Sequence, residues 1–555
     1  MGALKRIFTR DNRFLIAFST IVSILVTGSM YFYYNPSTGE GVPTYWWIEV
    51  LVAIVRLLLS FCFFFTILKA FNPKNIYYVN TKLFNRTRRL EVKDIIGDYV
   101  YFLLIWLVPL IVKYPGGLDY DTWALFEEFR LDQVTTHHFV FYMFVMGKLV
   151  GFCEARGSAD LGLFIFETLH YLFLVLAFGY SCNILRRFGA SNKVIWIYRL
   201  WTSLNPLIIG FIGVVIKDIF YSTNLFIAFL IISEGIILDD WIIPKWKLII
   251  AGGAIVIACL TRKNGLYVIL GVLLIIAIST FKNRRNYRIL ITIAVSVIMF
   301  IVASKGLNNY YHATPGSLRE AFSLPFQQTA RYSKYHGDDV TEEEKSIIDD
   351  CLTYETLASY YHPYRSDAVK GEYKDDASKL LPYFKVWFKQ FWRHPLCYIA
   401  ATWEQNYYLL VPELESKGIS FIRDWESSED ENHNIYIKLW EKTEQDLFRV
   451  PQSFKIINNK ILDFYFALFR LPIIGLFWYM TTSVYILLLI TYISMNSERT
   501  LSIPIMFFWL TILCVILGPI VATRYMFFNI YATPFLVGMT IYESRHVKDN
   551  GFSED

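Results

Sequence analysis

The segment from Tyr114 to Gly147, YPGGLDYDTWALFEEFRLDQVTTHHFVFYMFVMG, is the stretch around which the chain is organised. It follows an apolar run, residues 99–112, and its character changes within a few residues. A Pro-Gly-Gly break precedes two aspartates, Asp119 and Asp121, and the pair His137 and His138 comes further on. Ionisable groups at the end of a membrane helix are costly beside lipid, so they are functional candidates by default.

The composition indicates a membrane protein. The chain has 555 residues, of which 55% are hydrophobic and only 18% are charged, whereas soluble domains carry about 25% charged residues. Apolar runs of roughly 17 to 25 residues recur, each long enough to cross about 30 Å of hydrocarbon. We therefore predict an all-α polytopic membrane protein with about 12 transmembrane helices. The predicted spans are residues 14–34, 46–70, 97–113, 160–180, 194–214, 219–238, 246–261, 264–280, 289–305, 471–494, 501–519 and 524–542.

The basic residues predict the orientation of these spans. Lys and Arg concentrate in the N-terminal tail, in residues 74–93 and in the other short connections of one face, whereas the connection at 35–45 contains neither. By the positive-inside rule, both termini are expected to be cytoplasmic. The formal net charge of +5 is dispersed in short clusters between apolar runs, so it gives no indication of nucleic-acid binding.

Three regions are expected along the chain. Residues 1–305 form an N-terminal transmembrane module of about nine spans, which includes an outer loop at 114–159. Residues 306–470 are more polar and too long for a structureless loop, so they predict an extracytoplasmic, mainly helical domain. Residues 471–555 form a C-terminal transmembrane module and a short cytoplasmic tail. Within the polar domain, LPYFKVWFKQFWR predicts an amphipathic helix, either at the membrane interface or packed inside the domain.

With this topology, unusual polar residues from distant parts of the sequence fall on the outer face. They interrupt or end apolar runs, as in VVIKDIFYS, CLTRKNGLY and VATRYMFF, or open the polar domain, as in SLPFQQTAR. The candidates beyond the outer loop are Lys217, Asp218, Arg262, Asn264, Gln327, Gln328, Arg331, Arg524 and Tyr525.

Such a set suits transfer of a group from a lipid-phosphate donor. Lysine and arginine would bind the phosphate and stabilise the charge that grows on it as it leaves. We assign this role to Lys217, Arg262, Arg524 and Arg331. A carboxylate would take the proton of the attacking hydroxyl; Asp121 is the candidate base. Asp119 is its supporting partner, and the two could share a divalent cation, Mg²⁺ or Mn²⁺. The candidates for substrate binding are His137, His138, Asp218, Asn264, Gln327, Gln328 and Tyr525.

Each element also has a purely structural interpretation. The two aspartates could solvate a loop, and the two histidines could be packed or interfacial. Lys217 and Asp218 could form a local ion pair that ends a helix. The arginines could extend to lipid headgroups without a catalytic role.

The order of these motifs resembles the GT-C superfamily of membrane glycosyltransferases, and more closely a bacterial group of GT-C-like membrane proteins. The stretches that carry the resemblance are YPGGLDYDT, THHFVFYMFVMG, NPLIIGFIGVVIKDIFYS, LTRKNGLYV, REAFSLPFQQTARYSKYH, YHPYRSDAVK and RHPLCYIAATWEQNYYLLVPE, with the later ATRY turn.

The resemblance implies a catalytic aspartate in the first outer loop, matched by Asp121, and a polyprenyl-phosphate sugar as the donor. It places Lys217, Arg262 and Arg524 near the lipid phosphate. The sequence departs from the family pattern after the aspartate, where Trp123 and Ala124 stand instead of an early glutamine. Its acidic pair is also not adjacent.

The expected function is glycosyl transfer at the outer face of a bacterial cell membrane, within the lipid bilayer. The acceptor would be a cell-envelope molecule: a cell-wall polymer, a glycolipid or a protein. Two alternatives stay open. One is a transporter or flippase of lipid-linked oligosaccharide, which the lack of a clear internal repeat disfavours. The other is a polysaccharide polymerase or ligase, which shares the span count and the large outer loop.

Overall fold

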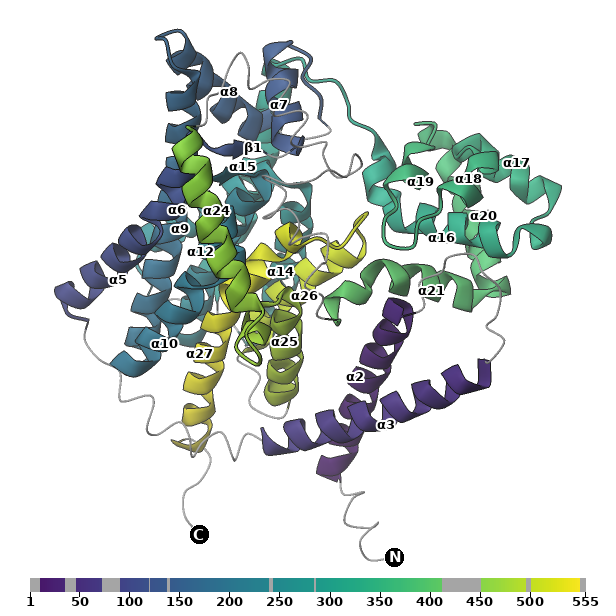
Figure 1. Cartoon of the computed structure of the whole chain (residues 1–555), viewed down its shortest axis with the longest axis horizontal. Helices are drawn as coiled ribbons and strands as arrows, with labels where there is room; N and C mark the ends of the chain where they lie inside the picture. Colours follow the sequence, from purple (N-terminus) through teal and green to yellow (C-terminus); the bar gives the residue numbers. More distant parts are fainter. Residues whose placement is uncertain are drawn as a thin grey trace, which may run out of the picture. The chain divides into compact units, whose positions relative to one another are not determined.

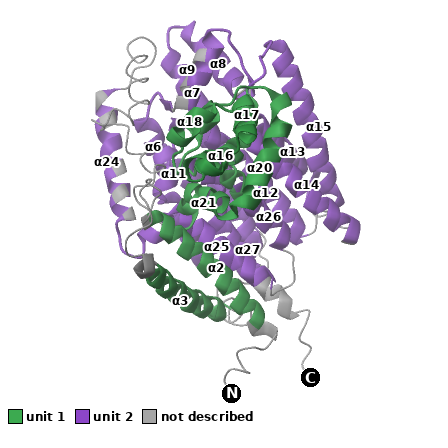
Figure 2. Ribbon diagram, turned by 90° about the vertical axis from the view of Figure 1, so that its right-hand side faces the viewer, with its two compact units in different colours: residues 1–72, 317–413, 512–522 green, residues 73–316, 414–511, 523–555 purple. Residues whose placement is uncertain are grey.

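A computed structural model describes residues 10–34, 46–71, 90–118, 120–136, 140–238, 243–283, 286–411, 451–495 and 501–549. These residues are mostly helical, as predicted (Figure 1). The chain divides into two compact units, coloured separately in Figure 2. Unit 1 comprises residues 1–72, 317–413 and 512–522, and unit 2 comprises residues 73–316, 414–511 and 523–555.

Unit 1 combines two long N-terminal helices with a group of short ones. The long helices are α2 (Arg10–Tyr34) and α3 (Trp46–Ala70). The short elements are η1 (Leu318–Phe322), α16 (Ser323–Tyr335), η2 (Gly337–Asp339), α17 (Glu342–Cys351), α18 (Tyr354–Tyr360), α19 (Asp367–Gly371), η3 (Ala377–Lys379), α20 (Leu380–Arg393), α21 (Pro395–Asn406) and η4 (Tyr407–Leu409).

Unit 2 contains most of the apolar helices. They are α5 (Val92–Ile105), α6 (Leu107–Val112), α7 (Tyr120–Arg130), α8 (Val140–Glu154), α9 (Ala159–Arg187), α10 (Asn192–Ser203), α11 (Pro206–Phe211), α12 (Lys217–Leu238), α13 (Lys245–Thr261), α14 (Lys263–Asn283), α15 (Tyr287–Tyr310), α24 (Gln452–Phe469), η5 (Gly475–Trp478), α25 (Met480–Met495), η7 (Thr523–Met526) and α27 (Phe527–Asp549). The strands β1 (Gly117–Leu118) and β2 (Val214–Val215) also belong here, and α26 (Ser502–Ile516) begins in this unit and ends in unit 1.

Seven helical segments in the described part of the chain are long and apolar enough to cross a membrane. They are Arg13–Tyr33, Val50–Ala70, Val92–Val112, Ala159–Arg187, Lys217–Leu238, Lys263–Lys282 and Tyr287–Tyr310. All seven coincide with predicted spans, but the expected count of about twelve is not confirmed. The apolar helices α25 and α26 are shorter, with 16 and 15 residues.

The predicted span at 194–214 is two short helices, α10 and α11. Pro206 causes the interruption, because it lacks an N–H and disfavours helical backbone at the residue before it. Asn205 caps the new helix: its side-chain oxygen accepts a hydrogen bond from the N–H of Leu207, at 2.9 Å. Similarly, Pro109 has no N–H for the carbonyl of Ile105, the residue at which α5 ends.

Residues 114–159, expected as an outer loop, contain two helices instead, α7 and α8. Both bury apolar side chains with α9 in the main core cluster, which includes Phe126, Met143, Met146 and Phe166. The sequence analysis did not predict these two helices, and the position of this segment at the outer face stays a prediction.

The predicted amphipathic helix in the polar region is α20. Its Phe384 and Trp387 pack against the core cluster of unit 1, around Phe326, Ile348 and Tyr383. On its other side, Phe388 and Trp392 are exposed. Phe384 and Trp387 therefore fit the interpretation of α20 as a helix packed within the domain.

A buried ionic cluster stabilises this group of helices. Thr341 and Glu344 form a capping box at the start of α17. The carboxylate of Glu344, which is 3% exposed, accepts hydrogen bonds from both Arg393 nitrogens at 2.9 and 3.2 Å, and Lys389 lies 2.8 Å away. Burial alone raises the pKa of Glu344, but the hydrogen bonds from Arg393 and Lys389 outweigh it and lower that pKa to about 2.

We predict that Arg393→Ala lowers the free energy of unfolding by about 3 kcal/mol, because it leaves a buried carboxylate without its bidentate partner. Lys389→Ala is the control: its side chain is 62% exposed, so its loss costs about 1 kcal/mol or less. Thermal unfolding of the purified full chain measures both. The stabilisation from Glu344 is complete above its unfolded pKa of about 4.3 and is lost as the pH falls towards 2.

A second prediction concerns the close contact between α8 and α9. A Cβ added to Gly162 would lie 2.7 Å from Cα of Val150 and 3.0 Å from the carbonyl oxygen of Leu149. These are backbone atoms, so Gly162→Ala should separate the helices and destabilise the protein by about 1 to 3 kcal/mol. Gly151→Ala, in α8 with nothing within 4 Å, should instead be neutral or stabilising by up to about 1 kcal/mol. Equal melting temperatures for the two variants would contradict this packing.

Candidate functional site

Two short strands bring distant helix starts together in unit 2. β1 and β2 pair in parallel, with Gly117 opposite Val214 and Leu118 opposite Val215. Each strand leads almost directly into a helix, β1 into α7 and β2 into α12. Because the strands are parallel, the two helix starts emerge at the same end of the pair. The hydroxyl of Thr122 on α7 also donates to the carbonyl of Val215, at 2.8 Å.

Two buried ionisable side chains fix the backbone that leads into β2. Lys113 donates to the carbonyl oxygens of Ile209, Gly210 and Ile212 at 3.0, 2.8 and 2.5 Å, and so satisfies the carbonyls at the end of α11. On the other side, Oε1 of Glu167 accepts the N–H of Gly213 at 3.1 Å.

Gly213 has a φ of +81°, and a Cβ there would lie 2.8 Å from Cβ of Lys113. Both the positive φ and the close approach of Lys113 therefore require glycine at this position.

Asp121 and Lys217, one from each helix start, form the first ion pair of the site. Nζ of Lys217 lies 3.1 Å from Oδ2 of Asp121, and a guanidinium nitrogen of Arg524 lies 3.6 Å from the same oxygen. The Asp121 side chain is 25% exposed, which leaves it accessible from outside the protein. Lys217, at the start of α12, thus pairs with a carboxylate at the start of α7.

Asp218 is the buried counterpart of Asp121. Its side chain is 1% exposed and forms a salt bridge with Arg262, from the connection between α13 and α14. The Nε of Arg524 lies 3.8 Å from its other oxygen. Arg524 therefore connects the two carboxylates. The arginine side chains are only 15% and 12% exposed, so they are held in the protein rather than extended to the surface.

Tyr525 forms an aromatic wall beside the arginines. The Arg262 guanidinium lies 4.1 Å from the centre of its ring, and that of Arg524 lies 5.1 Å from it. Arg524 also donates to the phenol oxygen at 3.2 Å. These contacts fix the planes of both guanidinium groups through cation–π attraction and one hydrogen bond.

Among the described residues, three cationic side chains, Lys217, Arg262 and Arg524, lie at or beside two carboxylates, Asp121 and Asp218, in a region of low exposure. Electrostatic attraction is stronger where water is largely excluded. The arrangement can therefore bind an anionic group with several oxygens, such as a phosphate, beside an accessible carboxylate. Asn264 is half-buried in the first turn of α14, two residues after Arg262.

Asp119, His137 and His138 lie outside the described residues, so their predicted roles stay predictions. A divalent cation shared by Asp119 and Asp121 also stays a prediction. Two cationic side chains already contact the one carboxylate oxygen described, and they would repel a metal ion there.

The three remaining candidates belong to unit 1, where they connect helices. Arg331 forms a salt bridge with the fully buried Glu404 and donates to the Tyr361 hydroxyl at 2.8 Å. The side-chain nitrogen of Gln327 donates to the carbonyl of His362 at 2.5 Å, and that of Gln328 to the hydroxyl of Thr402 at 2.9 Å. These observed contacts are structural, and phosphate binding by Arg331 stays a prediction.

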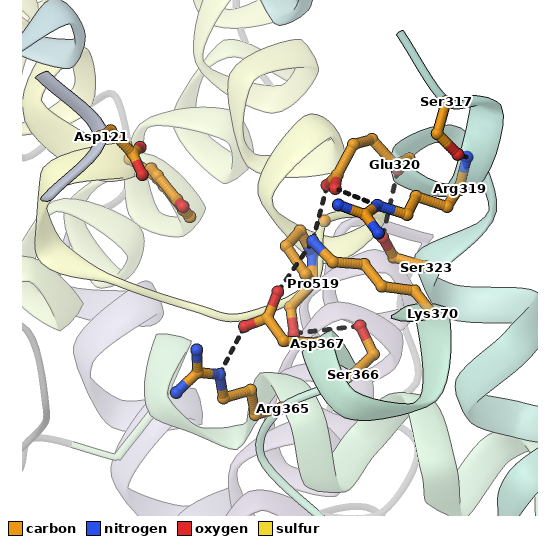
Figure 3. A network of polar contacts seen from close by, with 12 residues as sticks. Asp121, Ser317, Arg319, Glu320, Ser323, Arg365, Ser366, Asp367, Lys370 and Pro519 are labelled. Atoms are coloured by element: carbon orange, nitrogen blue, oxygen red, sulfur yellow. Dashed lines mark hydrogen bonds and ion pairs between the residues drawn. The ribbon is translucent and has the colours of Figure 1, made fainter. Parts of the chain in front are cut away.

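Unit 1 also contains a polar network that the sequence did not indicate (Figure 3). Lys370 lies 2.7 Å from both Glu320 and Asp367, and Asp367 is also paired with Arg365. Burial raises the pKa of Asp367, but Lys370 and Arg365 outweigh it and hold this pKa below its usual value.

Next to that network, residues of unit 1 bind the backbone carbonyls of the segment that precedes Arg524. The backbone N–H and the hydroxyl of Ser366 donate to the carbonyl of Pro519 at 3.0 and 3.2 Å. Gln405 donates to the carbonyl of Gly518.

Sequence reasoning missed Lys113 and Glu167. Both had a signal, since each is an ionisable residue inside or at the end of an apolar run. Their hydrogen bonds to backbone show that such residues can serve the fold of a site without entering it.

Comparison with known proteins assigns the chain to a family. The model of a family of unknown function, DUF6020, matches residues 132–553, about three quarters of the chain, so the chain belongs to this family. The match includes Lys217, Asp218, Arg262 and Arg524. Neither the curated proteins nor the solved structures gave a match.

The two carboxylates of the site should respond differently to neutralisation. Asp218→Asn leaves buried arginines without their counter-charge and should lower the free energy of unfolding by about 3 to 5 kcal/mol. Asp121→Asn changes a partly exposed group and should cost about 1 kcal/mol or less. Thermal unfolding of the purified chain distinguishes them. A larger loss for Asp121→Asn would reverse the assignment of the structural and the accessible carboxylate.

Proposed function

We propose that this family member is a membrane glycosyltransferase that moves a sugar from a polyprenyl-phosphate donor to the hydroxyl of an acceptor. The donor phosphate binds between Lys217, Arg262 and Arg524, and Asp121 is the general base. Transfer takes place at the outer face of a cell membrane that the chain spans several times, with a cell-envelope molecule as the acceptor.

The observation that carries this proposal is the accessible carboxylate of Asp121 beside three cations that other parts of the fold hold in place. Lys217 and Arg524 contact the carboxylate in the absence of substrate. A bound phosphate competes for the same cations and so releases the carboxylate to accept a proton. A base and a group of phosphate-binding cations are the two components that this reaction requires.

The reaction then needs one proton transfer and one bond exchange. Asp121 takes the proton of the acceptor hydroxyl as its oxygen attacks the anomeric carbon of the sugar. The bond from that carbon to the phosphate oxygen breaks, and the electron pair stays on the lipid phosphate. The three cations stabilise this growing negative charge more in the transition state than in the ground state, which lowers the barrier. No step requires a metal ion.

Asp218 has a different part in this scheme. It is buried and binds Arg262, while Arg524 lies close to its second oxygen. Without this counter-charge, two arginines would repel each other in a poorly hydrated place. Asp218 is therefore a positioning residue, which holds the guanidinium groups where the phosphate binds. The similarity of the ordered motifs to GT-C enzymes supports the choice of donor.

The test is donor turnover by the purified chain in lipid nanodiscs, with a panel of polyprenyl-phosphate sugars and total membrane lipid as the acceptor. We expect Asp121→Asn to lower the rate about 10²- to 10⁴-fold through loss of the base. Arg524→Ala should lower it about 10²- to 10³-fold through loss of phosphate stabilisation. Lys305→Ala, which removes an exposed lysine of α15, is the control and should leave the rate unchanged.

The same experiment separates the competing functions. Full turnover by Asp121→Asn would exclude this residue as the base. Movement of an intact lipid-linked sugar between leaflets, without release of lipid phosphate, would identify a flippase instead. Addition of a chelator should not change the rate, and a chelator-sensitive rate would contradict the metal-free scheme.

A further inference from the structure

Two histidines and an aspartate converge in unit 1, and the proposed function uses none of them. His336 ends α16, Asp339 ends η2, and His394 stands between α20 and α21. One nitrogen from each imidazole and one carboxylate oxygen all lie within 4.8 Å of one another. We infer that His336, Asp339 and His394 form a binding site for a divalent transition metal of the Zn²⁺ type.

Both imidazoles point a nitrogen at the same carboxylate oxygen. Nε2 of His394 lies 2.8 Å from Oδ2 of Asp339, and Nδ1 of His336 lies 3.9 Å from it. A hydrogen bond between Asp339 and His394 explains the first contact but gives no reason for the second histidine. Ligands on one zinc ion lie about 3 Å apart, since each is about 2 Å from the metal. Side-chain rotations that unstack the two imidazole rings would therefore bring all three groups onto one ion.

Neighbouring residues orient the ligands. The two imidazole rings are stacked with their centres 3.8 Å apart and their planes 13° apart, and the Tyr332 ring packs against each of them. Arg393 donates to the backbone carbonyl of Asp339 at 2.6 Å and so fixes η2 without occupying the carboxylate. Such outer contacts are what hold metal ligands in their geometry.

The donor set selects the class of metal. Imidazole nitrogen with carboxylate suits Zn²⁺, Ni²⁺, Cu²⁺ and Fe²⁺, whereas Mg²⁺ and Ca²⁺ prefer oxygen ligands alone. The three side chains are 30% to 50% exposed, so water can complete the coordination. A bound ion would join the end of α16 to the junction between α20 and α21 and would stabilise this part of unit 1.

The experiment is titration of the full chain, prepared without a histidine tag, with Zn²⁺ and with Co²⁺ as a spectroscopic probe. We expect one equivalent of Zn²⁺ to bind, a Co²⁺ absorption band to appear, and the melting temperature to rise. The double variant His336→Gln/His394→Gln and the single variant Asp339→Asn should each weaken binding at least tenfold. His312→Gln, an exposed histidine of unit 2, is the control and should bind as the wild type does.

Two results would overturn the inference. One is a wild type that binds no Zn²⁺ at millimolar concentration. The other is unchanged affinity in the Asp339→Asn variant and in the double variant. Circular dichroism shows whether each variant keeps its helix content, and Mg²⁺ should neither bind to the site nor displace Co²⁺. This site is independent of the proposed transferase, so its failure leaves that proposal untouched.

Discussion

The site in unit 2 depends on one constraint, the need to satisfy backbone hydrogen-bonding groups where an apolar helix is interrupted. Between α11 and α12 the chain leaves helical geometry while its neighbours are apolar helices. Exposed N–H and C=O groups are costly in such surroundings. Lys113 satisfies three carbonyls, Glu167 accepts one N–H, and pairing of β2 with β1 satisfies others. The irregular segment is therefore fixed in place, and with it the start of α12.

The position of the start of α12 determines where two charged residues of the site lie. Lys217, at the start of α12, pairs with the partly exposed carboxylate of Asp121. The next residue, Asp218, is buried and pairs with Arg262. The two carboxylates thus have different roles: Asp218 compensates the charge of the arginines, and Asp121 is partly exposed. The ring of Tyr525 packs against both guanidinium groups. Three cations gathered in a place of low exposure favour an anionic ligand.

The sequence predicted part of this arrangement. The interruptions VVIKDIFYS, CLTRKNGLY and VATRYMFF each stood out as charge in an apolar run, and the structure places Lys217, Arg262 and Arg524 together. Strand pairing over two residues leaves no periodic signal, so β1 and β2 could not be predicted. The helices α7 and α8, inside the expected outer loop, were not predicted, although both bury apolar side chains. The salt bridge between Arg331 and Glu404 could not be predicted either, because the two residues are 73 positions apart, beyond any local pattern.

Arg524 is connected by a short segment to a stretch of backbone that unit 1 binds. Unit 1 holds the carbonyls of Gly518 and Pro519 through Gln405 and Ser366, and Arg524 follows five residues after Pro519. Five residues span at most about 18 Å when extended. This length limits how far Arg524 of unit 2 can lie from Pro519 of unit 1. The length of the polypeptide alone sets this limit, without a side-chain relay. An insertion between Pro519 and Arg524 would relax this limit while every residue of the charged site stayed the same.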